Sequence, residues 1–144
     1  MTVEAIAEVL GGTKLLRKRV GTASDLVELT RKGLPANILP AIAVDLSIDR
    51  ATLARVAGIS GRTLSRRIAS HSLLSAEESD RMVRLARVLA FANETLGDKT
   101  KASRWLQTPN TVLDGKTPFE LLDTDTGVQS VENVLGRIAY GVYS

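Results

Sequence analysis

The middle of the chain carries side chains whose chemistry suits nucleic-acid binding. Residues 60–67 read SerGlyArgThrLeuSerArgArg, with three arginines, three hydroxyl side chains and no acidic residue. Guanidinium groups form paired hydrogen bonds to phosphate and to guanine, while hydroxyls and the N-terminus of a helix bind phosphate oxygens. In a helix, one polar face of this segment would consist of Ser60, Arg62, Thr63, Arg66 and Arg67. The alternative interpretation is an ordinary solvated helix surface, because arginine is also a good helix former.

The segment that must position this cluster has the pattern of a helix-turn-helix. Such a motif needs a small residue where its helices cross, a left-handed turn residue, an apolar residue after the turn, and apolar residues on the inner face of the second helix. These needs are met, in that order, by Ala54, Gly58, Ile59, and the pair Leu64 and Ile68. The pattern predicts DNA binding in the major groove, through Ser60, Gly61, Arg62, Thr63, Ser65, Arg66 and Arg67.

One position departs from the usual helix-turn-helix pattern. In phage-repressor-like proteins an apolar residue follows three positions after the one at Leu64, whereas here that position is Arg67 and Ile68 comes next. The four-residue spacing still keeps one inner face, but we expect a different docking angle for the second helix. A helix-turn-helix used only for packing is the alternative to DNA binding.

The net charge of +3 is concentrated in the same region. Residues 50–91 contain eight arginines and three acidic residues, whereas residues 1–49 are neutral and residues 92–144 have a net charge of −2. A basic segment between neutral and acidic ones favours a polyanionic partner for that segment alone.

Little in the chain suits catalysis. With 144 residues, no cysteine and one histidine, it has no thiol chemistry and no carboxylate cluster with metal-ligand spacing, and no glycine-rich phosphate loop is present. We expect no catalytic residue, metal or cofactor. The N-terminus lacks the features of a signal peptide, and no stretch approaches the ~18–20 apolar residues of a membrane span, so we expect a cytoplasmic protein with no membrane partner.

Helix start and stop signals predict an all-α fold. We expect helices at about 3–10, 24–32 (capped by Ser24), 38–46, 50–57, 61–70, 76–96, 98–106 and 126–140, with a further helix start at 117–120. Ser75 and Glu78 form a capping box for the long helix 76–96. We divide the chain into residues 1–75, with the helix-turn-helix at about 50–70, and residues 76–144.

Aromatic residues concentrate at the end of the chain. Four of the five lie within the last forty positions, at Trp105, Phe119, Tyr140 and Tyr143. Aromatic side chains contribute much of the energy of cores and of interfaces. This region is therefore a well-specified core, a binding surface, or both.

The C-terminal sequence resembles the toxin-binding domain of the MbcA/ParS/Xre antitoxin family. The matching residues are Trp105-Leu106, Thr108-Pro109-Asn110, Leu113, Gly115, Thr117-Pro118, Leu121-Leu122, Thr124, Gly127, Val131, Leu135, Ile138 and Tyr140-Gly141-Val142. The helix-turn-helix with ThrLeuSerArgArg at 63–67, followed by 74–81, is similar to the N-terminal half of the same family.

This resemblance implies an antitoxin of a type II toxin–antitoxin system. Its expected partner is a RES-domain toxin that consumes NAD, which it would neutralise, while repressing its own operon through the helix-turn-helix. Family members are typically dimers through the C-terminal half. The residues assigned to toxin binding are Trp105, Asn110, Tyr140, Gly141, Val142, Tyr143 and Ser144.

Two alternatives stay open from the residues themselves. The segment 140–144 either reaches the entrance of the toxin's active site, as a short aromatic and anionic tail, or packs back on its helix through Tyr140 and Val142. For the whole protein, the alternative is a stand-alone helix-turn-helix repressor controlled by a small-molecule effector, which would need an apolar cavity in its C-terminal half.

Overall fold

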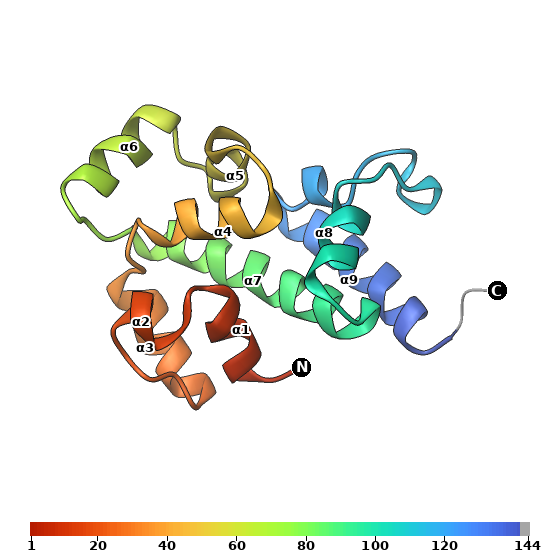
Figure 1. Ribbon diagram of the computed structural model, residues 1–144, viewed down its shortest axis with the longest axis horizontal. Helices are drawn as coiled ribbons and strands as arrows, with labels where there is room; N and C mark the ends of the chain where they lie inside the picture. Colours follow the sequence, from red (N-terminus) through yellow and green to blue (C-terminus); the bar gives the residue numbers. More distant parts are fainter. Residues whose placement is uncertain (142–144) are drawn as a thin grey trace.

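The computed structural model describes residues 1–141, and its regular elements over that range are all helical (Figure 1). The α-helices are α1 (Val3–Val9), α2 (Gly12–Leu16), α3 (Ala23–Lys32), α4 (Ile38–Leu46), α5 (Arg50–Ala57), α6 (Gly61–Ala69), α7 (Ala76–Leu96), α8 (Lys99–Leu106) and α9 (Asp125–Ala139). Two 3-10 helices, η1 (Thr111–Leu113) and η2 (Phe119–Leu121), connect α8 to α9. The predicted all-α class is confirmed.

Helix α7 is the centre of the molecule. It packs against α1, α3, α5, α8 and α9. In Figure 1 it runs across the middle, with α1–α3 on one side and α4–α6 on the other. Its apolar stripe is buried, and consists of Met82, Leu85, Ala86, Leu89 and Ala92. One helix therefore joins the helix-turn-helix to the C-terminal elements.

Local capping explains where most of the helices begin. The helices predicted at 38–46, 50–57 and 76–96 have these same bounds. Ser75 and Glu78 form the predicted capping box of α7, and Gly97 ends that helix in the left-handed conformation.

One prediction about the N-terminal helices was wrong, and one short helix was not predicted. Helix α3 is capped by Thr22, which forms a capping box with Asp25, so Ser24 lies inside the helix. The short helix α2 was not predicted, because Gly11-Gly12 reads as a helix stop. Gly11 does take a positive φ of 110°, but the chain turns directly into α2 and buries Leu16 against the core. Burial in the tertiary structure, rather than a local capping signal, accounts for this helix.

The C-terminal elements form a small unit built around α9. Helices α8 and α9 both pack on α7, and η1 and η2 both pack on α9. At the predicted helix start 117–120, Thr117 and Glu120 form a reciprocal pair, with the Thr117 N–H donating to Glu120 Oε1 at 2.7 Å and the Glu120 N–H donating to Thr117 Oγ1 at 3.2 Å. The helix that follows is only the 3-10 turn η2. Thr124 caps α9 by accepting the Gly127 N–H at 3.0 Å.

The part of the chain that the structure describes contains neither a membrane-spanning helix nor a metal-binding cluster. Across residues 1–141, no helix is long and apolar enough to cross a membrane. Over the same residues, no group of three histidine or carboxylate side chains is placed to hold a metal ion.

Candidate nucleic-acid interface and partner-binding region

Helices α5 and α6 form the helix-turn-helix that the sequence predicts. Gly58 takes the left-handed conformation between them, with φ 73° and ψ 30°. Ala54 is buried where the helices meet, Ile59 is buried just after the turn, and Leu64 is fully buried on the inner face of α6. Ile68 is only partly buried against the core. The predicted inner face is thus confirmed, with Leu64 as its main apolar contact.

The outer face of α6 is open to solvent. Its exposed residues are Gly61, Arg62, Ser65 and Arg66. Neither Arg62 nor Arg66 forms an ion pair with another described residue. A Cβ at Gly61 would meet no atom within 4 Å, so the space beside this residue is open. This face can therefore approach a polyanion without first breaking internal contacts.

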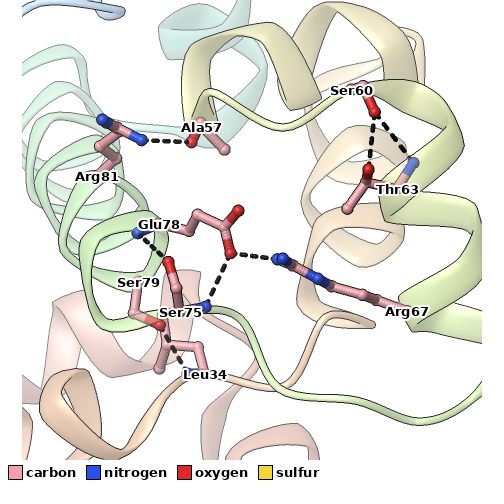
Figure 2. A network of polar contacts seen from close by, with 9 residues as sticks. All are labelled: Leu34, Ala57, Ser60, Thr63, Arg67, Ser75, Glu78, Ser79 and Arg81. Atoms are coloured by element: carbon pink, nitrogen blue, oxygen red, sulfur yellow. Dashed lines mark hydrogen bonds and ion pairs between the residues drawn. The ribbon is translucent and has the colours of Figure 1, made fainter.

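The hydroxyls at the start of α6 are used partly inside the motif. Ser60 Oγ accepts the Thr63 N–H at 3.1 Å and donates to Thr63 Oγ1 at 2.9 Å (Figure 2). Thr63 is half-buried, whereas Ser60 is exposed. Ser60 is therefore the N-cap of α6, and Thr63 keeps its own hydroxyl hydrogen for another acceptor.

The structure corrects the expected position of Arg67. Instead of lying on the exposed face, its guanidinium donates through Nη1 to Glu78 Oε1 at the start of α7 (Figure 2). The two side chains are only 24% and 13% exposed. Arg67 lies three residues after the buried Leu64, and residues at this spacing share one face of a helix. Its side chain therefore points to the core side of α6 rather than to solvent.

Other arginines of the basic segment are also paired internally. Arg87 forms a two-pronged contact with Glu132 of α9, at 2.8 Å and 3.1 Å. The hydrogen bonds that Arg87 donates to the Glu132 carboxylate raise the pKa of Arg87 above its usual value. Further pairs join Arg55 to Asp123 at 3.1 Å and Arg84 to Asp125 at 3.2 Å. The acidic C-terminal region thus neutralises part of the basic segment. Fewer arginines of residues 50–91 are therefore free to contact DNA than the sequence suggests.

The residues assigned to toxin binding do not share one environment. Trp105 and Asn110 are half-buried. Trp105 packs against the core, and the Asn110 side chain accepts the Val112 N–H at 2.9 Å to start η1. Tyr140, in contrast, is 85% exposed just after the end of α9, and it is followed by the exposed Gly141 with φ 68°. Val142, Tyr143 and Ser144 lie outside the described residues.

An apolar cavity of about 500 Å³ lies between α1, α4 and α7. Its floor includes Ile42, Leu46 and Leu89, and its rim includes Asp45 and Glu94. An effector-controlled repressor would need such a cavity in its C-terminal half, whereas this one lies mainly among N-terminal elements and the end of α7. The volume of this cavity is typical of ligand sites.

Comparison with known proteins places both parts of the chain. Residues 25–87 match the family model described as the antitoxin Xre-like helix-turn-helix domain, and residues 91–141 match the antitoxin Xre/MbcA/ParS C-terminal toxin-binding domain. The chain is 34% identical over 137 residues to "Antitoxin Xre" of Yersinia enterocolitica serotype O:8 / biotype 1B, covering 92% of this chain and 93% of that protein. It is 36% identical over 117 residues to "Antitoxin Xre" of Photorhabdus laumondii subsp. laumondii, covering 81% and 79%.

A solved structure has the same fold. It is the crystal structure of the Mycobacterium tuberculosis MbcT–MbcA toxin–antitoxin complex, matched with a TM-score of 0.55 and 23% identity over 76% of this chain and 96% of the matched chain. At that identity the match supports the fold alone. Because the Yersinia relative is matched over nearly its full length, the chain belongs to the Xre/MbcA/ParS antitoxin family, as a type II antitoxin with a helix-turn-helix DNA-binding domain.

Proposed function

We propose that this protein neutralises a cognate RES-domain, NAD-consuming toxin through its C-terminal region and represses its own operon through α5 and α6. The toxin-binding role rests on the family match of residues 91–141. A cognate toxin as partner is also supported by the relatives of 34% and 36% identity, both of which are named antitoxins. The assignment of a RES-domain toxin follows from the family resemblance, as does a homodimer formed through the C-terminal half.

One observation points to the contact surface. Tyr140 leaves 85% of its side chain exposed at the end of α9, whereas Phe119 is buried and Phe91 and Trp105 pack against the core. A tyrosine exposed at a helix end presents apolar area and a hydroxyl at low entropic cost, as residues that dominate interfaces do. The exposed side chain argues against Tyr140 packing back on its own helix. It favours instead a tail that reaches the toxin.

The experiment is co-expression with the product of the adjacent gene, with an affinity tag on that product. We expect the wild-type chain to co-purify with it. Tyr140→Ala should weaken the complex at least tenfold if Tyr140 is a central contact, since such residues cost about 2 kcal/mol or more on truncation. Deletion of residues 141–144 should weaken it as well.

Val44→Ala is the matched control. Val44 is 78% exposed on α4, so its truncation also removes exposed apolar area, but far from the C-terminal region in sequence. We expect this variant to co-purify like the wild type. Unchanged toxin binding by both the Tyr140 variant and the deletion would exclude the tail as the contact. A chain that purifies alone would instead favour the effector-controlled repressor and direct attention to the cavity beside α1.

The DNA-binding half has its own test. The wild-type chain should bind the DNA upstream of its own gene, and the affinity should fall steeply with salt because arginine–phosphate contacts release counterions. Sedimentation of the free chain tests the homodimer. Binding that is insensitive to salt would contradict a phosphate-contacting α6.

A further inference from the structure

Glu78 joins the recognition helix to the central helix. Its Oε1 accepts two hydrogen bonds, one from the Ser75 N–H at 2.8 Å and one from Arg67 Nη1 of α6 (Figure 2). Its own N–H donates to Ser75 Oγ at 3.1 Å, completing the capping box of α7. Burial opposes ionisation of Glu78, but the hydrogen bonds from Ser75 and Arg67 outweigh it, so its pKa lies below the usual value. The carboxylate is therefore held in its charged form, between two elements.

A second arginine contact lies close to the first. Arg81, one turn further along α7, donates to the Ala57 carbonyl at the end of α5 at 3.3 Å (Figure 2). The start of α7 thus holds the turn of the motif through Arg81 and the second helix through Arg67.

The apolar contacts of α6 are few. Leu64 is the one buried residue among the nine of this helix, and Ile68 is only partly buried. A single apolar anchor fixes the depth of a helix better than its rotation or tilt, because the side chain can pivot in its pocket. The Arg67–Glu78 pair supplies a second fixed point one turn away, at the position where related motifs carry an apolar side chain.

We propose that Arg67 and Glu78 are positioning residues for DNA binding, which fix the orientation of α6 so that Arg62 and Arg66 reach the DNA while Arg67 does not contact it. The proposal rests on the proposed function of α5 and α6. It has an unusual consequence, because it makes DNA affinity depend on an acidic residue. Simple electrostatics predicts the opposite, since removing a carboxylate near DNA should strengthen binding.

Glu78→Gln is the decisive variant. Glutamine can replace glutamate in a capping box, so the start of α7 is kept while the charge that holds Arg67 is lost. The matched control is Glu77→Gln, which removes an exposed carboxylate from the same turn of α7. This carboxylate has no ion-pair partner among the described residues. Affinity for the upstream DNA is measured over a range of salt concentrations, with circular dichroism to confirm that each variant is folded at the assay temperature.

We expect Glu77→Gln to bind as tightly as the wild type or slightly more tightly, and Glu78→Gln to bind about tenfold more weakly. Arg67→Ala should weaken binding by a similar factor without changing the salt dependence. A lost phosphate contact would instead lower the slope of log affinity against log salt by about one. The double variant Arg67→Ala/Glu78→Gln should be no weaker than either single variant, because both changes remove the same link.

Each single variant leaves the remaining partner of the Arg67–Glu78 pair as an unpaired charge, and a further double variant avoids this. Arg67→Met/Glu78→Gln places an apolar side chain where related motifs have one, and it should bind DNA within about threefold of the wild type, because volume-conserving replacements of partly buried ion pairs are well tolerated. Two results would overturn the proposal: Glu78→Gln binding as tightly as Glu77→Gln, or a reduced salt slope for Arg67→Met/Glu78→Gln. If the wild type itself did not bind, the DNA-binding function would fail first, and this proposal with it.

Discussion

Two glycines of α9 should respond in opposite directions to the same substitution. Gly127 lies in the first turn of the helix, against the backbone of Leu121. A Cβ at this position would lie 1.8 Å from the Leu121 carbonyl oxygen and 2.8 Å from its carbon. Since such contacts essentially never fall below 3.0 Å, the helix and η2 would have to separate by about 1.2 Å. Gly136, two turns further along, would place a Cβ with nothing within 4 Å.

The expected magnitudes follow from these two environments. Overpacking against backbone costs roughly 1–3 kcal/mol, and for a domain of this size each kcal/mol lowers Tm by about 3 °C, so Gly127→Ala should lower Tm by about 3–9 °C. Gly136→Ala removes a flexible glycine from a helix interior and should raise Tm by about 2–3 °C, because alanine is favoured there by about 0.5–1 kcal/mol.

Thermal unfolding of both variants, followed by circular dichroism at one protein concentration, checks the prediction. Because α9 carries Tyr140 at its end, Gly127→Ala should also weaken toxin binding at temperatures where the chain is still folded. A Gly127→Ala variant as stable as Gly136→Ala would refute the close packing of α9 on η2.

Arg66→Ala should weaken DNA binding by about 1–3 kcal/mol, or roughly 5- to 150-fold, if Arg66 reads a base, while Arg137→Ala on α9 removes the same charge and should leave the affinity unchanged in the same titration. The lowered pKa of Glu78 means that its contribution to stability is fully present above pH 4.5 and is lost as the pH falls through the lower folded-state value, so urea unfolding curves of the wild type and of Glu78→Gln should converge in acid. Leu64→Ala should cost about 2–5 kcal/mol in the free energy of unfolding, because Leu64 is the one fully buried side chain of α6; a cost below about 1 kcal/mol would contradict that burial.

Elements defined by local signals were predictable from the sequence. The capping box that marks the start of α7 lies within the four residues from Ser75 to Glu78. The turn and the inner apolar residue of the helix-turn-helix lie within the seven residues from Gly58 to Leu64. Such signals act over one or two turns of backbone, so an isolated segment already contains them. The assignment of the C-terminal region to a family likewise rests on short motifs, and the match of residues 91–141 confirms this assignment.

Features set by distant partners were not predictable in this way. Arg67 reads as one more basic residue on a polar face, and its contact with Glu78 follows only from the way α6 packs on α7. The Arg55–Asp123 pair joins residues 68 positions apart, so the partial neutralisation of the basic segment is a property of the tertiary structure. The exposure of Tyr140 could not be decided either, because the same residue suits a packed helix end and an open contact surface.

Neutralisation of a toxin by this chain can be measured most directly through the growth of cells. The adjacent gene is induced in cells that carry either the wild-type chain, the chain with Tyr140→Ala and residues 141–144 deleted, or no antitoxin. We expect arrested growth without the antitoxin, full growth with the wild type, and restored arrest with the combined variant present at the same intracellular level. Arrest in the presence of the wild-type chain would contradict the neutralising function, and full growth with the combined variant would contradict the C-terminal contact.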